Sequence, residues 1–334
     1  MERRIPSLDG LRAASIALVM ASHLSLPVRV LSGIDYGNLG VRVFFVISGF
    51  LITTLLVAEL ETSGSVSLRA FYARRCLRIL PAYYTFLLAM TLLIPTGWLR
   101  ASFAGLLPAA TFSMNYFPVT MTLAHSWSLA VEEQFYLLWP LTLVSFGVRR
   151  SVYGCAALLL IAPIFRELAA LGLWPTPVTT AFESVCDALA VGCLLAILRK
   201  RLWDNVLYRA CVGSPYVLLI PVAALAGTAA VPTAALHTLS ISVLNIGIGL
   251  GLDRYIRFPT TLVGRILNWG PMRWVGTVSY SLYLWQQPFM FNTLRLHWYV
   301  KVAGSFACGA ASFYWVERPA LRLRRSFAPP RQVP

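Results

Sequence analysis

The sequence predicts an all-α integral membrane protein that crosses the bilayer roughly ten times, with its N- and C-termini on the cytoplasmic side. Composition is the first reason. Hydrophobic residues make up 58% of the chain and charged residues only 12%, and the mean hydropathy is +0.69. A soluble globular chain is nearer a quarter charged, so these few charges cannot cover a water-facing surface. The second reason is that the apolar residues form runs of about 20, the length of a membrane-spanning helix.

The predicted spans follow one another along the whole chain, which we therefore treat as a single transmembrane domain over residues 1–334. They lie near residues 11–31, 38–58, 79–98, 129–147, 152–171, 182–198, 213–231, 236–252, 274–293 and 300–316. The stretch 99–128 is half apolar and contains two prolines. We interpret it as a re-entrant or interfacial segment, which requires that it be buried in protein or line a cavity.

The charge distribution gives the orientation. A net charge of +15 would suit a nucleic-acid partner, but the bases lie in short clusters between apolar runs and form no patch or tail. Most of the 28 Lys and Arg residues fall in loops that the ten-span arrangement makes cytoplasmic, where they face membrane lipids. The exceptions are Arg29, Arg42, Arg100, Arg166, Arg295 and Lys301. We therefore expect no nucleic-acid partner.

The six cysteines indicate neither disulfides nor a metal site. They are Cys76, Cys155, Cys186, Cys193, Cys211 and Cys308. None forms a CxxC pair or has metal-ligand spacing to a histidine. Cysteines inside apolar runs behave as small hydrophobic residues.

Two residues of the first predicted span have a spacing with chemical meaning. Arg12 and His23 are eleven residues apart, which is three helical turns plus about 20°, so they share a face at an axial separation of ~16 Å. An extended phosphopantetheine arm has about that length. A base near mid-membrane thus lies in line with a cation at the cytoplasmic surface. The alternative is a core histidine that is hydrogen-bonded to a neighbouring helix.

Two adjacent carboxylates, Glu132 and Glu133, start the fourth predicted span. Ionisable residues within a membrane are costly and usually functional. Either carboxylate can orient His23 and stabilise its protonated form, or bind a cation. The alternative is a helix-start carboxylate that is satisfied by the N-terminal amides of the helix.

Three arginines, Arg74, Arg75 and Arg78, lie in the second predicted cytoplasmic loop. If this stretch is helical, Arg78 is a neighbour of both others. Paired guanidinium groups suit bidentate contact with phosphate. The alternative is charge that serves only to orient the chain beside anionic lipid.

Polar residues in other spans are candidates for binding an acceptor molecule. Arg42, at the start of the second span, can pair with an outer carboxylate or bind an acceptor anion. Tyr280, Trp285 and Gln286 belong to an aromatic and polar stretch that can stack on sugar rings, or that forms an interfacial aromatic belt.

Five segments resemble the acyltransferase-3 family of bacterial membrane acyltransferases, in the family's order and across nearly the whole chain. They are SLDGLR at 7–12 followed by His23, FFVISGFLI at 44–52, FYARRCLRILP at 71–81, HSWSLAVEEQFY at 125–136, and SYSLYLW at 279–285 followed by Pro288. The resemblance implies an O-acyltransferase of the bacterial cytoplasmic (inner) membrane. Such an enzyme moves acetyl or another short acyl group from cytoplasmic acyl-CoA to a hydroxyl of a sugar or glycoconjugate, without a metal.

The resemblance also implies a role for each matching residue. His23 becomes the catalytic base, with Glu132 and Glu133 as further catalytic candidates. The resemblance implies donor binding by Arg75 and Arg78, with Arg12 as the motif partner of His23. We expect Arg12 and Arg74 to contribute to donor binding as well, and we expect the acceptor to be bound by Arg42, Trp127, Tyr136, Tyr280, Trp285 and Gln286.

The chain departs from the family pattern at two points. Many members have Leu-Trp-His near the ninth span, but this chain has Gln286 at the third position, so no titrating role is expected there. Many members also carry an appended esterase-like domain, and we expect this chain to work alone or with a separate extracytoplasmic protein. The rival interpretation is a proton-coupled transporter or flippase, because intramembrane His and Glu also suit a proton relay. Against it, we see no internal repeat with paired broken helices.

Overall fold

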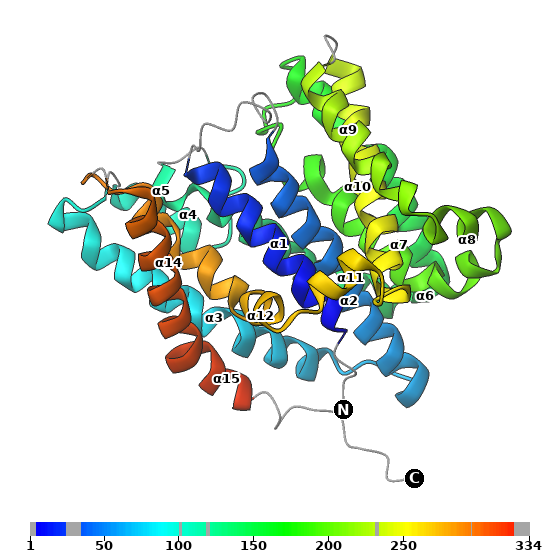
Figure 1. Cartoon of the computed structure of the whole chain (residues 1–334), viewed down its shortest axis with the longest axis horizontal. Coiled ribbons are helices and arrows are strands. Elements are labelled where there is room, and N and C mark those ends of the chain that lie inside the picture. Colours follow the sequence, from blue (N-terminus) through cyan, green and yellow to red (C-terminus); the bar gives the residue numbers. More distant parts are fainter. Residues whose placement is uncertain are drawn as a thin grey trace. The chain divides into compact units, whose positions relative to one another are not determined.

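The computed structural model describes residues 5–24, 35–99, 102–117, 121–230, 234–294 and 296–323. Over this part of the chain the protein is helical, without β-strands, and one isolated bridge joins Leu99 to Asn292 (Figure 1). The α-helices are α1 (Pro6–His23), α2 (Tyr36–Ser63), α3 (Leu68–Leu93), α4 (Leu106–Ala110), α5 (Met121–Ala124), α6 (Ser126–Ala170), α7 (Phe182–Asp204), α8 (Val206–Gly213), α9 (Leu219–Ala230), α10 (Ala234–Arg257), α11 (Leu262–Leu267), α12 (Gly270–Trp285), α13 (Gln287–Met290), α14 (Trp298–Ser312) and α15 (Arg318–Leu323). Short 3-10 helices are η2 (Ile94–Thr96), η3 (Phe103–Gly105) and η4 (Pro215–Leu218), and η5 (Phe313–Glu317) is a π-helix. The predicted all-α class is confirmed for these residues.

The chain forms two compact units, each built from segments that are distant in the sequence. Unit 1 comprises residues 1–58 and 131–277, and unit 2 comprises residues 59–130 and 278–334. Unit 1 therefore contains α1, α7 to α11 and most of α2 and α6. Unit 2 contains α3 to α5, the second half of α12, and α13 to α15.

Several helices are long and apolar enough to cross a membrane, as predicted. Within the described residues there are four of them, at 36–63, 68–96, 126–170 and 237–257. The pair Val206–Gly213 and Pro215–Thr228, bent by 77°, would add a fifth if the two cross together. The count of ten spans and the cytoplasmic placement of both termini remain predictions. Residues 25–31 of the first predicted span lie outside the described part of the chain.

Helix α1 differs from its predicted span at both ends. It begins at Pro6, where a proline is well tolerated because the first amides of a helix have no intrahelical partner. It ends at His23. A helix that continued would place the ring of Pro27 against the carbonyl of His23, four residues earlier. His23 was predicted to lie deep inside its span but is the last residue of α1.

Helix α6 has two arms. Its 45 residues would measure ~68 Å as one straight helix, about twice the hydrocarbon thickness of a bilayer. Gly147 interrupts it with φ 73° and ψ 164°, a conformation that glycine adopts without steric cost. The predicted spans 129–147 and 152–171 coincide with the two arms.

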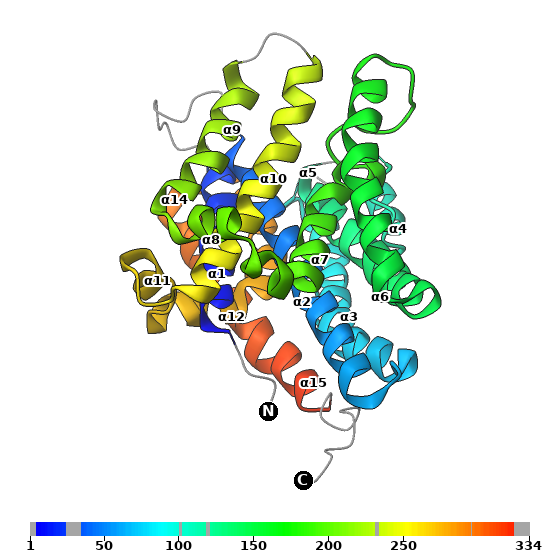
Figure 2. The ribbon, with the colours of Figure 1, turned by 90° about the vertical axis from the view of Figure 1, so that its right-hand side faces the viewer.

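In unit 1, α2 and α7 approach each other closely through glycine. A Cβ on Gly49 would lie 2.1 Å from the carbonyl oxygen of Leu189, and one on Gly192 would lie 2.2 Å from that of Val46. Small residues allow such backbone contact, which is common between membrane helices. On another side of the unit, α9 and α10 lie side by side (Figure 2).

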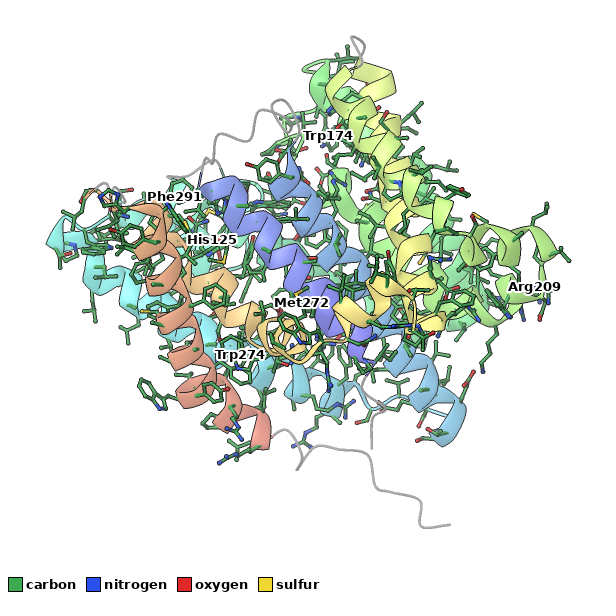
Figure 3. The ribbon with its side chains drawn as sticks, viewed as in Figure 1. His125, Trp174, Arg209, Met272, Trp274 and Phe291 are labelled. Carbon is green, nitrogen blue, oxygen red and sulfur yellow. The ribbon has the colours of Figure 1, made fainter. Side chains whose placement is uncertain are left out.

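An ion-pair cluster joins the ends of α7 and α10 to α8. The buried carboxylate of Asp253 accepts hydrogen bonds from Arg199 Nε at 2.5 Å, from Arg257 Nε at 2.7 Å and from the hydroxyl of Tyr208 at 3.0 Å. By contrast, Arg209 of α8 points away from the unit (Figure 3). Arg199 and Arg257, which were predicted to orient the chain in the membrane, therefore also stabilise the packing of these helices.

In unit 2, the segment predicted to be re-entrant folds against α3. Of its described residues, 102–117 form η3, α4 and connecting turns, and 121–128 form α5 and the start of α6. The hydroxyls of Tyr83 and Tyr84 donate to the carbonyls of Ala109 and Ala110 at 2.8 and 3.0 Å. These two side-chain bonds tie the segment to α3. The membrane depth of this segment remains a prediction.

Candidate active site

The first candidate pair lies on one uninterrupted helix. Arg12 and His23 both belong to α1, so the predicted axial separation of ~16 Å on one face follows from the observed helix. Both side chains are half-buried. Arg12 Nη1 lies 3.9 Å from the carboxylate of Asp9, one turn earlier on α1. This ion pair joins Arg12 to the first turn of α1.

Close contacts at two glycines hold both ends of α1 within unit 1. Near Arg12, a Cβ on Gly276 would lie 1.8 Å from the carbonyl oxygen of Asp9, so the start of α12 rests directly on α1. Near His23, a Cβ on Gly37 would lie 2.4 Å from Ser22 Oγ. The last turn of α1 therefore lies against the first turn of α2.

Glu132 accepts a hydrogen bond from a serine hydroxyl, which itself accepts one from a tyrosine hydroxyl. Ser48 of α2 donates to Glu132 Oε1 at 2.6 Å, and the hydroxyl of Tyr136 donates to Ser48 Oγ at 3.0 Å. Tyr136 is four residues after Glu132, so both lie on the same face of α6. The structure thus joins two predicted site residues through Ser48, which the sequence analysis did not single out even though it lies in a quoted motif.

The position of the two glutamates argues against the helix-start alternative. Helix α6 begins at Ser126, and no acidic residue lies in its first turn. Only the first four amides of a helix lack an intrahelical partner, and Glu132 is beyond them. Glu133 is half-buried and points about 100° away from Glu132 around the helix axis.

The three arginines of α3 have different surroundings within unit 2. Helix α3 covers all three, so Arg78 neighbours both Arg74 and Arg75 as predicted. Arg74 Nη2 pairs with Glu59 Oε2 at 3.0 Å, and Glu59 Oε1 also accepts from the backbone amide of Ser67, the N-cap residue of α3. Arg75 lies over the ring of Phe71 at 5.8 Å. Arg74 thus holds the turn before α3.

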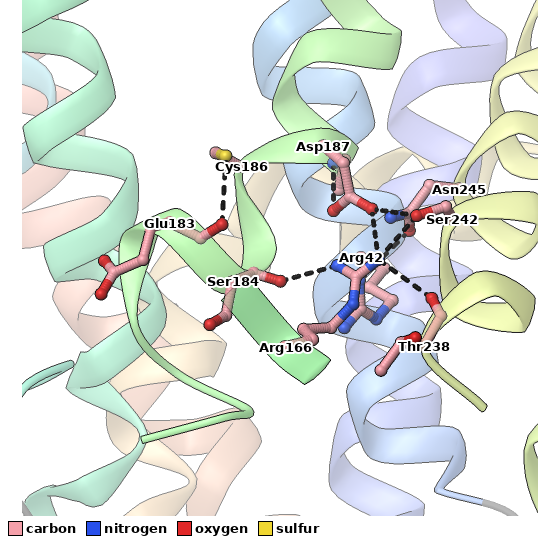
Figure 4. Close-up of polar contacts among 10 residues, drawn as sticks. Arg42, Arg166, Glu183, Ser184, Cys186, Asp187, Thr238, Ser242 and Asn245 are labelled. Carbon is pink, nitrogen blue, oxygen red and sulfur yellow. Dashed lines mark hydrogen bonds and ion pairs between the residues drawn. The ribbon is translucent and has the colours of Figure 1, made fainter. Parts of the chain in front are cut away.

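Arg42 is one of the most deeply buried charged residues of unit 1. It is 3% exposed, and its Nη1 donates to Asn245 Oδ1 at 3.4 Å. A second buried arginine belongs to the same region (Figure 4). Arg166 Nη2 pairs with Asp187 at 3.0 Å, and its other bonds go to Ser184, Thr238 and Ser242. Asp187 is therefore the structural partner of Arg166.

The acceptor candidates of unit 2 are spread over two environments. The hydroxyl of Tyr280 donates to the carbonyl of Ile79 at 2.9 Å, which ties α12 to α3 beside Arg78. Trp285 packs edge-on against Phe86 with ring centres 5.9 Å apart. Gln286 is fully buried, whereas Trp127 is half-buried.

The structure also shows a histidine that the sequence analysis quoted but did not assign. His125, labelled in Figure 3, is 4% exposed and packs against Phe86 and Tyr283. The hydroxyl of Tyr283 donates to the carbonyl of His125 at 2.8 Å and lies 2.6 Å from Ser128 Oγ. A lone histidine before a helix gave no signal of this aromatic surround, because the surround comes from distant segments.

A buried carboxylate was missed as well. Glu317 is 1% exposed, ends the π-helix η5, and accepts a hydrogen bond from Ser281 at 2.8 Å. Single π-helical turns are frequent at functional sites. In the sequence, Glu317 stands in a Glu-Arg-Pro at the end of an apolar run, and this pattern does not indicate a buried carboxylate.

Within the described residues, no group of three or more His, Cys, Asp or Glu side chains lies close enough together to hold a metal ion. All six cysteines are free thiols.

Comparison with known proteins identifies relatives over nearly the whole chain. A family model described as an acyltransferase domain, from the acyltransferase-3 family, matches residues 5–316. The peptidoglycan O-acetyltransferase OatA of Listeria monocytogenes is 29% identical, over 94% of this chain and 55% of the relative. The putative peptidoglycan O-acetyltransferase YrhL of Bacillus subtilis is 26% identical, over 95% of this chain and 55% of the relative. The O-acetyltransferase OatA of Staphylococcus aureus is 28% identical, over 86% of this chain and 50% of the relative.

This chain spans about half the length of the curated relatives that it matches. No solved structure matches it. The family model, however, covers nearly every residue from α1 to the π-helix η5. The chain therefore belongs to the acyltransferase-3 family.

Proposed function

We propose that the protein is a membrane O-acetyltransferase that moves an acetyl or other short acyl group from cytoplasmic acyl-CoA to a hydroxyl of a sugar polymer or glycoconjugate. One observation carries the proposal: α1 is continuous from Pro6 to His23, so a guanidinium and an imidazole share one face of a helix at ~16 Å. Family membership supplies the reaction class. Two of the relatives named above, OatA of Listeria monocytogenes and YrhL of Bacillus subtilis, carry peptidoglycan O-acetyltransferase in their names, which supports a sugar polymer as the acceptor.

In this proposal the donor enters along α1. The phosphates of acyl-CoA lie near Arg12 at the predicted cytoplasmic end, and Arg75 and Arg78 of α3 bind further phosphate oxygens. Arg74 contributes least, because its guanidinium is already paired with Glu59. An axial distance of ~16 Å is about half the hydrocarbon thickness of a bilayer. The thioester thus reaches the last turn of α1.

The reaction is a proton transfer coupled to acyl transfer. Neutral His23 takes the proton of the acceptor hydroxyl, and the oxygen attacks the thioester carbonyl. The carbon–sulfur bond breaks and the CoA thiolate leaves. His23 then gives its proton to the thiolate. The products are an ester and free CoA. The carboxylate of Glu132, which Ser48 and Tyr136 fix in place, stabilises the charged imidazole during the reaction.

An alternative order of steps uses the same residues. His23 or another nucleophile first takes the acyl group, releases CoA, and then transfers the group to the acceptor. Release of CoA in the absence of an acceptor, at the rate of full turnover, would select this order.

The experiment is acetyl transfer in nanodiscs. Purified protein receives acetyl-CoA labelled in the acetyl group and peptidoglycan glycan strands, and labelled strands are counted. We expect transfer by the wild type and by His237→Ala, because His237 is an exposed histidine of α10. We expect none by His23→Ala. Wild-type rates in His23→Ala would overturn the proposal.

A further inference from the structure

A buried group of charged residues in unit 1 has one more positive than negative charge. Arg42 and Arg166 are 3% and 1% exposed, and the single carboxylate between them, Asp187, is 0% exposed. The next acidic group in electrostatic range of Arg42 is Asp35, which is exposed to solvent. A buried charge without a counter-charge is strongly unfavourable. The cluster is therefore short of one negative charge.

Arg42 is the residue of the cluster that lacks a counter-charge among the described residues. Asp187 Oδ2 accepts from Arg166 at 3.0 Å and from Ser242 at 2.8 Å, and its Oδ1 accepts from a backbone amide. Arg166 has three further acceptors, whereas Arg42 has, within the described part of the chain, a single bond of 3.4 Å to Asn245. A guanidinium has five N–H donors. Most of those of Arg42 thus lack an acceptor among the described residues.

Asn245 adds a hydrogen-bond donor, its side-chain amide, beside Arg42. Its side-chain oxygen faces Arg42, and its Nδ2 is buried with no hydrogen-bond partner among the described residues. Buried amide groups are normally paired. Figure 4 shows that Arg42 and Asn245 lie beside the Arg166–Asp187 pair. The arrangement presents guanidinium and amide N–H groups and needs an acceptor with one negative charge.

The cluster belongs to the end of unit 1 that also holds His23. Arg42 follows the first residue of α2 by six positions, or ~9 Å along the helix axis. The first turn of α2 lies against Ser22, next to His23. The levels of His23 and Arg42 therefore differ by ~8 Å along α2. One sugar unit with an acidic substituent can span such a distance.

We propose that Arg42 and Asn245 bind a carboxylate of the acceptor, so that the enzyme selects acidic sugars. The inference rests on the proposed function, because it takes His23 as the place of the reacting hydroxyl. A carboxylate fits better than a phosphate monoester, which carries nearly two negative charges at neutral pH where the cluster lacks one. Its two oxygens also match the planar guanidinium in a bidentate pair.

The test compares binding of two sugars that differ only in charge. The probes are labelled N-acetylmuramic acid and its methyl ester, bound at equilibrium to purified protein in nanodiscs without any acyl donor. We expect the wild type to bind the acid at least about tenfold more tightly than the ester, as for a hydrogen bond to a charged group. Arg42→Gln should reduce this ratio to about one, and Arg42→Lys should retain part of it.

Asn245→Asp is the decisive variant. The change is nearly isosteric and places the missing negative charge beside Arg42. We expect a thermal midpoint at or above that of the wild type, together with loss of the preference for the acid. A folded Asn245→Asp protein that still prefers the acid would overturn the inference. So would equal binding of both sugars by the wild type.

The outcomes also separate this inference from the proposed function. Acetyl transfer by a wild type that binds both sugars equally would contradict only the acidic acceptor. Binding of the acid that depends on Arg42, without transfer in any assay, would contradict only the transferase. Sodium acetate should displace the acidic sugar only at a large excess. Displacement at an equal concentration would assign the site to a free small anion instead.

Discussion

The contact between α2 and α7 gives a prediction whose magnitude follows from the structure. In Gly49→Ala, the new Cβ would lie 2.1 Å from the carbonyl oxygen of Leu189, although such contacts are essentially never below 3.0 Å. The obstructing atom is backbone, so one helix must move by roughly 1 Å. Overpacking of this kind costs about 1–3 kcal/mol. The adjacent Ser48, whose 2.6 Å bond holds Glu132, moves with α2.

Two readouts should therefore change together. A loss of 1–3 kcal/mol lowers the thermal midpoint by about 2–4 °C per kcal/mol in proteins of 150–250 residues. A displacement of ~1 Å at a reacting centre can reduce turnover about 100-fold. The assays are thermal unfolding in nanodiscs and acetyl transfer. Gly154→Ala is the matched control, because nothing lies within 4 Å of its new Cβ. Equal midpoints for the two variants would refute the reasoning.

Three further predictions follow from single contacts. Asp187→Asn leaves the guanidinium of Arg166 buried without its counter-charge, so thermal unfolding should show a loss of about 3–5 kcal/mol. Ser48→Ala removes the donor to Glu132 and should lower the turnover of acetyl transfer about tenfold or more, with little change in KM for the donor. Arg75→Ala/Arg78→Ala removes two phosphate ligands, so the KM for acetyl-CoA should rise at least about tenfold and become less sensitive to salt.

Two of these predictions have a control on the same element. Thr54→Ala lies on α2, where the Thr54 hydroxyl donates to the carbonyl of Phe50 in its own helix, and it should leave turnover unchanged. Arg69→Ala removes an exposed guanidinium from the first turn of α3 and should leave the KM unchanged. A KM that rises as much in Arg69→Ala as in the double variant would indicate general charge loss instead of a binding site. An Asp187→Asn protein as stable as the wild type would show that Arg166 needs no counter-charge.

The sequence predicted the helical class because hydrophobic runs reflect the solvent around each helix. The break of α6 near Gly147 was predictable for the same reason. Helix α1 ends at His23, although the apolar run that predicted its span continues further, because Pro27 disfavours a continued helix. Apolar composition reports burial in lipid but not the local backbone geometry that ends a helix.

The candidate site was predictable only where its residues share one helix. Arg12 and His23 keep their spacing, and so do the arginines of α3, because helix geometry relates residues close in sequence. Contacts between helices were not predictable. The hydroxyl bond from Ser48 to Glu132, the pairing of Arg74 with Glu59, and the aromatic surround of His125 all depend on packing of distant segments. The charge shortage around Arg42 likewise became visible only in three dimensions.

The most direct test of the central claim is binding and slow hydrolysis of acetyl-CoA by the purified protein in nanodiscs. Wild type is compared with His23→Ala and with Arg75→Ala/Arg78→Ala, and both bound donor and released CoA thiol are measured. We predict that the wild type binds and releases CoA, that the histidine variant binds without release, and that the arginine variant fails to bind. If the folded wild type binds no acyl-CoA, the proposed donor is wrong, and a transport assay for a proton-coupled carrier becomes the next experiment.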